Sequence, residues 1–147
     1  GVAAARANAS MKERTDKEIA IRDHLIHRIE TEIPYVKVNG DRIKRLPNNV
    51  NVSFQFVEGE SLLLMLDNYG ICASSGSACT SGSLDPSHVL LAIGLPHEIA
   101  HGSLRMTLSE ETTMEDVDFV VDKLKEIVQY LRSMSPLYED FMKKQNK

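Results

Sequence analysis

Residues 50–56 read Val-Asn-Val-Ser-Phe-Gln-Phe, and this stretch decides the fold class. The apolar side chains of Val50, Val52, Phe54 and Phe56 alternate with polar ones, which is the period of a β-strand with one buried face. The stretch follows Pro-Asn-Asn at 47–49, a combination typical of a turn. We therefore predict a half-buried strand at this point.

A second alternation occupies residues 103–108. Leu104, Met106 and Leu108 face one way, so the alternation turns Arg105 away from the core. A shorter alternation at 35–39 ends in a Gly-Asp turn and predicts a third strand. Residues 71–73, Ile-Cys-Ala, are read as a brief buried strand.

Helical patterns enclose these strands at both ends of the chain. Isoleucines recur between Ile19 and Ile33 at spacings of seven, three and four, which predicts a helix from about residue 3 to residue 33, ended by Pro34. Short helices are expected at 62–67, at 85–94 and in a turn at 96–101.

A longer amphipathic helix follows in the last third of the chain. The pattern Thr112-x-x-Glu115 predicts a capping box at its start, and Pro136 ends it. One more packed turn is expected before a frayed tail at 143–147. We predict an α+β fold with a small, mainly antiparallel sheet and helices packed on one face. The expected organisation is one domain: an entry helix at 1–33, a body at 34–142 and the tail.

Size and composition exclude several classes of protein. The chain has 147 residues, with 42% hydrophobic and 26% charged residues, as in an ordinary globular domain. Its net charge of −4 argues against a nucleic-acid binder, and no apolar stretch is long enough to span a membrane. Only two cysteines, close in sequence, favour a reducing compartment, so we expect a cytoplasmic protein.

The segment 74–83 contains five serines, two glycines and no charge. It has nothing to bury in a core, so we expect a mobile loop. Cys79 lies at its centre, where a thiol is either a reactive nucleophile or an incidental loop residue. Cys72 lies between Ile71 and Ala73 and is expected to be a small buried hydrophobe.

Three other polar patterns need an interpretation. His97, Glu98 and His101 match the H-E-x-x-H motif of zinc hydrolases, but the segment is short and no third ligand follows, so a capped surface turn is preferred and no metal is expected. His24 and His27 are read as a solvated or interfacial pair. Arg105 is either a surface arginine or a fork for a carboxylate.

Taken together, the motifs are recognisable. Residues 74–90, SSGSACTSGSLDPSHVL, closely resemble the active-site loop of the pyridoxal-phosphate-dependent cysteine desulfurases of the nitrogen-fixation and iron-sulfur type. The resemblance extends to PNNVNVSF at 47–54, VEGESL at 57–62, AHGSLR at 100–105 and LRSMSPL at 131–137. It covers nearly the whole chain and is weakest before about residue 19.

The resemblance implies a fold and a chemistry. The fold is the carboxyl-terminal small domain of the aspartate-aminotransferase-like (fold type I) enzymes. The reaction converts L-cysteine to L-alanine and leaves a persulfide on the enzyme for iron-sulfur cluster assembly and other sulfur pathways. By motif position, Cys79 would be the nucleophile and Arg105 the anchor of the substrate carboxylate.

The resemblance also implies what the rest of a complete enzyme must supply. In this family a lysine in a large domain holds pyridoxal phosphate, and no lysine here has its Ser-x-His-Lys context. We therefore expect no cofactor-binding residue in the chain, a missing large domain and no activity in the isolated chain. A homodimer is expected for the complete enzyme, and an iron-sulfur scaffold or sulfur carrier as the acceptor. The alternative is a stand-alone persulfide carrier or interaction module without catalysis.

Overall fold

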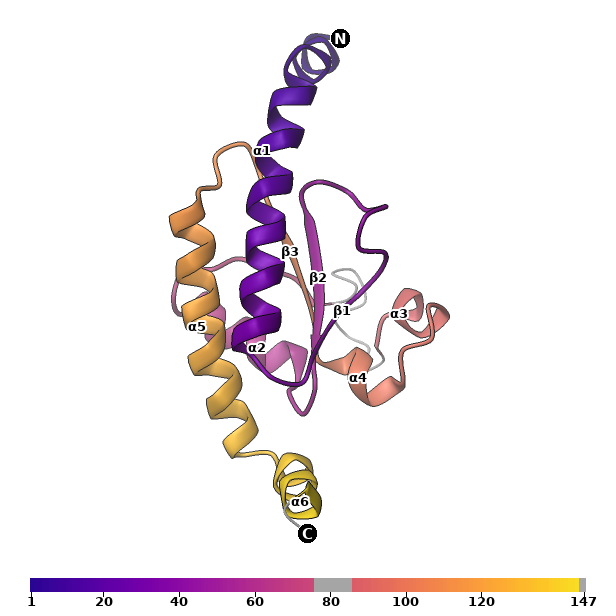
Figure 1. The fold of residues 1–147 in the computed structure, drawn as a ribbon, viewed down its shortest axis with the longest axis vertical. Helices are drawn as coiled ribbons and strands as arrows, with labels where there is room; N and C mark the ends of the chain where they lie inside the picture. Colours follow the sequence, from indigo (N-terminus) through magenta and orange to yellow (C-terminus); the bar gives the residue numbers. More distant parts are fainter. Residues whose placement is uncertain (76–85, 146–147) are drawn as a thin grey trace.

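The computed structural model describes residues 1–75 and 86–145, which form the helices and strands labelled in Figure 1. Cys79 and most of the predicted loop lie outside the described residues. In chain order the elements are α1 (Val2–Glu32), β1 (Val36–Val38), β2 (Asn49–Phe54), α2 (Gly59–Asp67), α3 (His88–Ala92), α4 (His97–His101), β3 (Ser103–Thr107), α5 (Met114–Ser133) and α6 (Pro136–Gln145).

The strands form an antiparallel sheet in the order β1-β2-β3. Strand β2 is central, with Val38 opposite Val52 on one side and Leu104 opposite Val52 on the other. Helices α1 and α5 lie side by side over part of their lengths, α1 also contacts β1 and β2, and α2 contacts β3 and α5 (Figure 1). The α+β fold with a small antiparallel sheet and helices on one face is therefore confirmed.

The core lies between the sheet and these helices. The alternation of β2 and β3 decides which side chains enter it: Val50, Val52, Phe54 and Leu104 are all fully buried. Helices α1 and α5 supply the opposite wall. Their fully buried side chains include Leu25, Ile29, Leu124 and Val121.

Helix α1 is predicted almost to the residue. It ends where Ile33 takes an extended backbone with φ −117° and ψ 111°, as expected before a proline. Its first buried residue is Ile21, and the part before it extends past the sheet, as Figure 1 shows. Among the described residues no helix is both long and apolar enough to cross a membrane.

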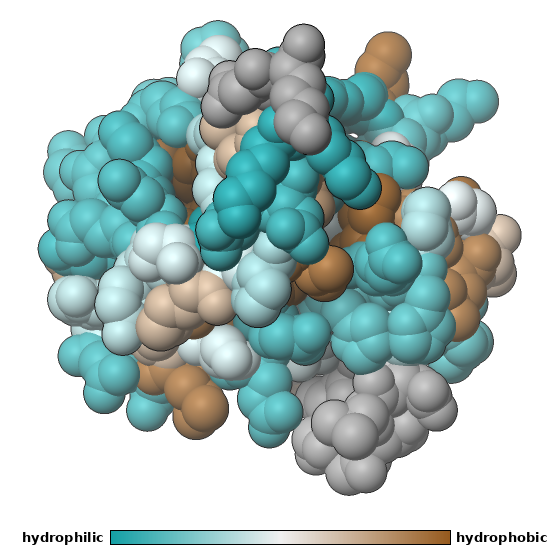
Figure 2. Space-filling model, turned by 90° about the horizontal axis from the view of Figure 1, so that it is seen from below, coloured by the Kyte–Doolittle hydropathy of each residue, from teal (hydrophilic) through white to brown (hydrophobic). Residues whose placement is uncertain are grey.

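Helices α3 and α4 form a small lobe with its own apolar cluster. Leu90, Leu95 and Ala100 are buried together, apart from the main core. Val89 on α3 and Ile93 directly after it are each more than half exposed. Figure 2 shows apolar side chains gathered at the right-hand edge of the molecule, where α3 lies.

The predicted strand at 71–73 is wrong. Ile71 donates its backbone N–H to the Leu66 carbonyl oxygen and so closes the end of α2. The chain reaches the free edge of β3 only at Ser74. Cys72 is consequently exposed and not the buried hydrophobe expected from its apolar neighbours.

The capping box of α5 lies one residue later than predicted. The Thr113 hydroxyl accepts the N–H of Asp116 at 3.1 Å, and the Asp116 carboxylate accepts the N–H of Thr113 at 2.9 Å. The hydrogen bond from the Thr113 backbone N–H, followed by the interaction with the Thr113 side chain, holds the pKa of Asp116 below its usual range. Thr112 instead accepts the backbone N–H of Ser109, so it belongs to the preceding turn.

The carboxyl-terminal end is also longer than one turn, because α6 continues to Gln145. It packs through Tyr138 and Phe141 on Tyr35 and Phe56. The prediction that Phe56 continues the buried face of β2 is wrong. The strand ends at Phe54, and a backbone φ of 65° turns Phe56 into this aromatic cluster.

Candidate functional site

Arg105 lies at the centre of β3, on the face of the sheet opposite the core. Its neighbours Leu104 and Met106 are buried, whereas Arg105 is half-buried, as the alternation predicted. Strand β2 places Asn51 directly opposite Arg105. We call this face the open face because α1, α2 and α5 pack on the other one. The three strands contribute no acidic residue to it and two basic ones, Lys37 and Arg105. The local charge therefore favours an anion.

Ser74 extends the sheet beyond β3 and pairs with Arg105 through two backbone hydrogen bonds. Ser74 donates to the Arg105 carbonyl oxygen at 3.0 Å, and Arg105 donates back at 2.6 Å. The chain therefore leaves the described part, after Ser75, directly beside Arg105. Cys79 is four residues further along, in the segment whose structure is not described.

Gly59, at the start of α2, allows the backbone to pass close to His101 and Ser75. A Cβ added at Gly59 would lie 2.8 Å from the His101 carbonyl oxygen and 3.4 Å from the Cβ of Ser75. The turn before α2 therefore packs against the start of β3 and the entry to the candidate loop. In the sequence, Gly59 belongs to the VEGESL stretch at 57–62, and its contact with the start of β3 was not predicted.

A buried polar network lies on the same face and was not predicted. The Asn39 amide group donates to the Asn51 side-chain oxygen at 2.7 Å and to the Ser53 hydroxyl at 2.9 Å. Asn39 and Ser53 are almost fully buried. The alternation identified Asn51 and Ser53 as a polar face, but only the pairing of β1 with β2 brings Asn39 to them.

The histidine pairs have different surroundings. The rings of His97 and His101 pack edge to face one helical turn apart, and Nδ1 of His101 is 4.0 Å from the Glu58 carboxylate. Within residues 1–75 and 86–145, no group of three or more histidine, cysteine or acidic side chains is placed to hold a metal ion. His24 contacts Asp118 of α5 at 2.7 Å and so lies at a helix interface.

The described lysines do not offer a site for pyridoxal phosphate. A lysine that forms a Schiff base is typically desolvated, and none of these lysines is buried. Several pair with surface carboxylates, among them Lys12 with Asp16 and Lys125 with Glu32. The described part of the chain therefore does not fit the covalent anchor of this cofactor.

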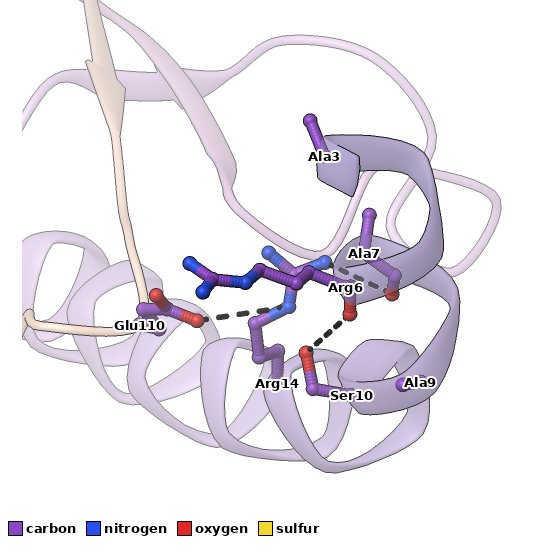
Figure 3. A pocket seen from close by; sticks show the side chains of 7 residues that line it. All are labelled: Ala3, Arg6, Ala7, Ala9, Ser10, Arg14 and Glu110. Atoms are coloured by element: carbon purple, nitrogen blue, oxygen red, sulfur yellow. Dashed lines mark hydrogen bonds and ion pairs between the residues drawn. The ribbon is translucent and has the colours of Figure 1, made fainter. Parts of the chain in front are cut away.

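A hollow of about 450 Å³ lies elsewhere, beside the amino-terminal end of α1 (Figure 3). Arg14 closes one side, with Nε 3.8 Å from the Glu110 carboxylate. The hollow contains neither a lysine nor a residue of the sheet. Its lining consists of Ala3, Arg6, Ala7, Ala9, Ser10, Arg14 and Glu110. It is therefore separate from the site around Arg105.

Comparison with solved structures identifies the class of protein. A NifS-like protein from Rickettsia africae superposes with a TM-score of 0.76 at 26% identity, covering 88% of this chain and 33% of its own. A second structure, titled a NifS-like protein, gives a TM-score of 0.72 at 27% identity and covers 84% of this chain and 30% of its own. The fold is thus that of a small α+β domain from enzymes that depend on pyridoxal phosphate.

Sequence comparison then gives the family. The family Aminotransferase class-V matches residues 2–120, so the chain belongs to it. A cysteine desulfurase IscS from Clostridium botulinum is 56% identical over 145 residues, which are 97% of this chain and 36% of that protein. One from Methanosarcina thermophila is 53% identical over 137 residues, covering 93% of this chain and 34% of its own. The chain spans about a third of the length of these relatives.

Proposed function

We propose that this chain is the nucleophile-bearing, carboxyl-terminal domain of a cysteine desulfurase. The supporting observation is the double backbone bridge between Ser74 and Arg105. It holds the entry to the segment that contains Cys79 beside an arginine, on a face to which the three strands contribute no carboxylate. A sulfur nucleophile and a carboxylate anchor are the two groups that a reaction on L-cysteine needs from this part of an enzyme.

In the proposed reaction, the Cys79 thiolate attacks the sulfur of L-cysteine. A sulfur-sulfur bond forms on the enzyme as the carbon-sulfur bond of the substrate breaks. The electron pair of the broken bond stays on the substrate carbon, which takes up a proton. The products are L-alanine and a Cys79 persulfide, with no external oxidant, and Arg105 holds the substrate carboxylate through two parallel hydrogen bonds.

The remaining two thirds of a desulfurase would supply the cofactor. Because the described lysines do not fit pyridoxal phosphate, we expect the isolated chain to be inactive. A homodimer of the complete enzyme, and a scaffold or carrier protein as the persulfide acceptor, also belong to this proposal. We also propose a cytoplasmic location, because reducing conditions suit a chain with only two cysteines.

A hybrid enzyme tests the proposal. In it, this chain replaces the matching 36% of the Clostridium botulinum desulfurase. Cys79→Ser is expected to lower alanine formation from L-cysteine on the order of a thousandfold or more, because it removes the sulfur nucleophile. Mass spectrometry should find the persulfide on Cys79. Cys72→Ser is the matched control and should keep full turnover, since Cys72 lies outside the candidate loop.

Two outcomes would contradict the proposal. Full turnover by Cys79→Ser would remove Cys79 from the reaction. Persulfide on Cys79 of the isolated chain, formed only when a separate desulfurase is supplied, together with an inactive hybrid enzyme, would instead support a stand-alone sulfur carrier.

A further inference from the structure

Four polar residues form one row across the sheet. Asn39 donates its backbone N–H to Asn51, Asn51 is opposite Arg105, and Arg105 pairs with Ser74. Directly paired residues in an antiparallel sheet point to the same face. The row therefore lies on the open face and runs from β1 to the point where the chain enters the candidate loop.

Asn51 and Arg105 are close neighbours within this row. The backbone bonds of β2 with β3 involve the even-numbered residues, because Phe54 donates to Gly102 and Leu108 donates to Asn48. Asn51 and Arg105 are thus a pair without backbone bonds between them. Such pairs have their Cα atoms about 4.5 Å apart and their side chains in closest proximity.

The amide of Asn51 is oriented by its contact with β1. Its oxygen accepts the hydrogen bond from Asn39, on the β1 side. The Asn39 amide is itself held, because it also donates to the Ser53 hydroxyl and is only 5% exposed. Since the two ends of a planar amide point in different directions, the NH₂ group of Asn51 is turned away from Asn39, and its neighbour on the far side is Arg105.

This orientation turns the NH₂ group of Asn51 toward the side of the row on which Arg105 lies, so that two donors are neighbours. The guanidinium has five N–H groups and no acceptor, and the NH₂ group of Asn51 also only donates. If Asn51 served to accept a hydrogen bond from Arg105, its oxygen would face the guanidinium. Among the described residues, no acceptor receives a hydrogen bond from either side chain. Adjacent donors with no internal acceptor are suited to binding the oxygens of an anion.

We propose that Asn51 is a second binding residue for the substrate carboxylate, and that Asn39 and Ser53 are positioning residues that hold its amide. This inference rests on the proposed function, which assigns the carboxylate to Arg105. It also gives a basis for substrate specificity. A carboxylate accepts hydrogen bonds from both Asn51 and Arg105, whereas an amine without a carboxylate leaves both donors unpaired.

The hybrid enzyme allows a test that separates this role from simple structural support. Asn51→Ala should raise the KM for L-cysteine and the inhibition constant of L-alanine about tenfold, the cost of one hydrogen bond to a charged group. The kcat should stay within about twofold. The inhibition constant of cysteamine, which has the amine and thiol but no carboxylate, should not change. Asn49→Ala is the matched control, because Asn49 is on the same face of β2 but opposite Thr107.

Asn39→Asp tests the positioning role without touching Asn51. An aspartate cannot donate to the Asn51 oxygen, so the Asn51 amide should rotate to donate to Asp and turn its oxygen toward Arg105. We expect the same rise in KM as for Asn51→Ala. The double variant should be no worse than either single variant, because both act through the same amide.

The outcomes are separable from those of the proposed function. If Arg105→Ala weakens L-alanine binding and Asn51→Ala does not, the Asn51 role is wrong while the function stands. Equal weakening of cysteamine and L-alanine by Asn51→Ala would show a structural effect and also overturn it. If neither variant affects L-alanine, the carboxylate anchor itself is misassigned. Circular dichroism and urea unfolding check that each variant is folded.

Discussion

Gly102 leaves the turn between α4 and β3 no room for a side chain. A Cβ there would overlap the Phe54 carbonyl oxygen and lie 2.8 Å from that of Val57. Both contacts are backbone atoms, so neither can rotate away. The close approach is what allows Phe54 to donate its N–H to Gly102 and start the pairing of β2 with β3.

We therefore predict that Gly102→Ala lowers the free energy of unfolding by about 3 kcal/mol, because the backbone must shift to admit the methyl group. Urea unfolding followed by circular dichroism measures this. Gly70→Ala is the control: Gly70 has a φ of 71° but open space around it, so only conformational strain of about 1 kcal/mol is expected. Equal losses for the two variants would contradict the steric explanation.

At the scale of elements, α1 and α5 are joined by a network of ion pairs on their outer surface. Arg28 contacts Glu32 of its own helix and both Asp118 and Asp122 of α5. Lys125 of α5 reaches back to Glu32 at 2.7 Å. Hydrogen bonds from Arg28 and Lys125 lower the pKa of Glu32 to about 2.

This pKa gives the helix pair a pH-dependent stability. A carboxyl group with a lower pKa in the folded state stabilises the fold above its ordinary pKa of 4.5, and this contribution is lost as the pH falls toward 2. Between pH 5 and pH 3 the unmodified chain should lose more stability than Glu32→Gln, as measured by urea midpoints. Glu13→Gln, on the exposed part of α1, should behave like the unmodified chain. A parallel decline of all three would contradict the prediction.

At the scale of the whole molecule, the lobe of α3 and α4 should open independently of the main core. Within the described part of the chain, the three buried residues of this lobe do not join the larger cluster. We predict that Leu90→Ala speeds amide hydrogen exchange in α3 and α4 while β2 keeps its protection. Val52→Ala, in the main core, should lower protection in both regions. Loss of β2 protection in Leu90→Ala would show that the lobe and the core unfold together.

Local patterns predicted most of this architecture, and distant pairings account for the rest. The alternation around Phe54 and Leu104, and the proline after Ile33, depend only on neighbouring residues, so strands and helix ends were predictable. The exposure of Cys72 depends on where the chain meets β3, and the contact of Asn39 with Asn51 depends on the register of β1. For the candidate site, the outward direction of Arg105 was predictable, whereas its polar neighbours were not.

The double bridge between Ser74 and Arg105 also limits the reach of the candidate nucleophile. Cys79 is four residues beyond Ser75, so its Cα stays within about 14 Å of that of Ser75 whatever path the chain takes. On the other side, Cys79 is seven residues from Pro86, which allows a distance of roughly 25 Å. The shorter connection, to Ser75, therefore sets the limit. In the function that we propose, L-cysteine and the sulfur acceptor must therefore both come within about this distance of Ser75. The pairing of Ser74 with β3 thus sets where the proposed sulfur transfer can take place, because it holds one end of the shorter connection against the sheet.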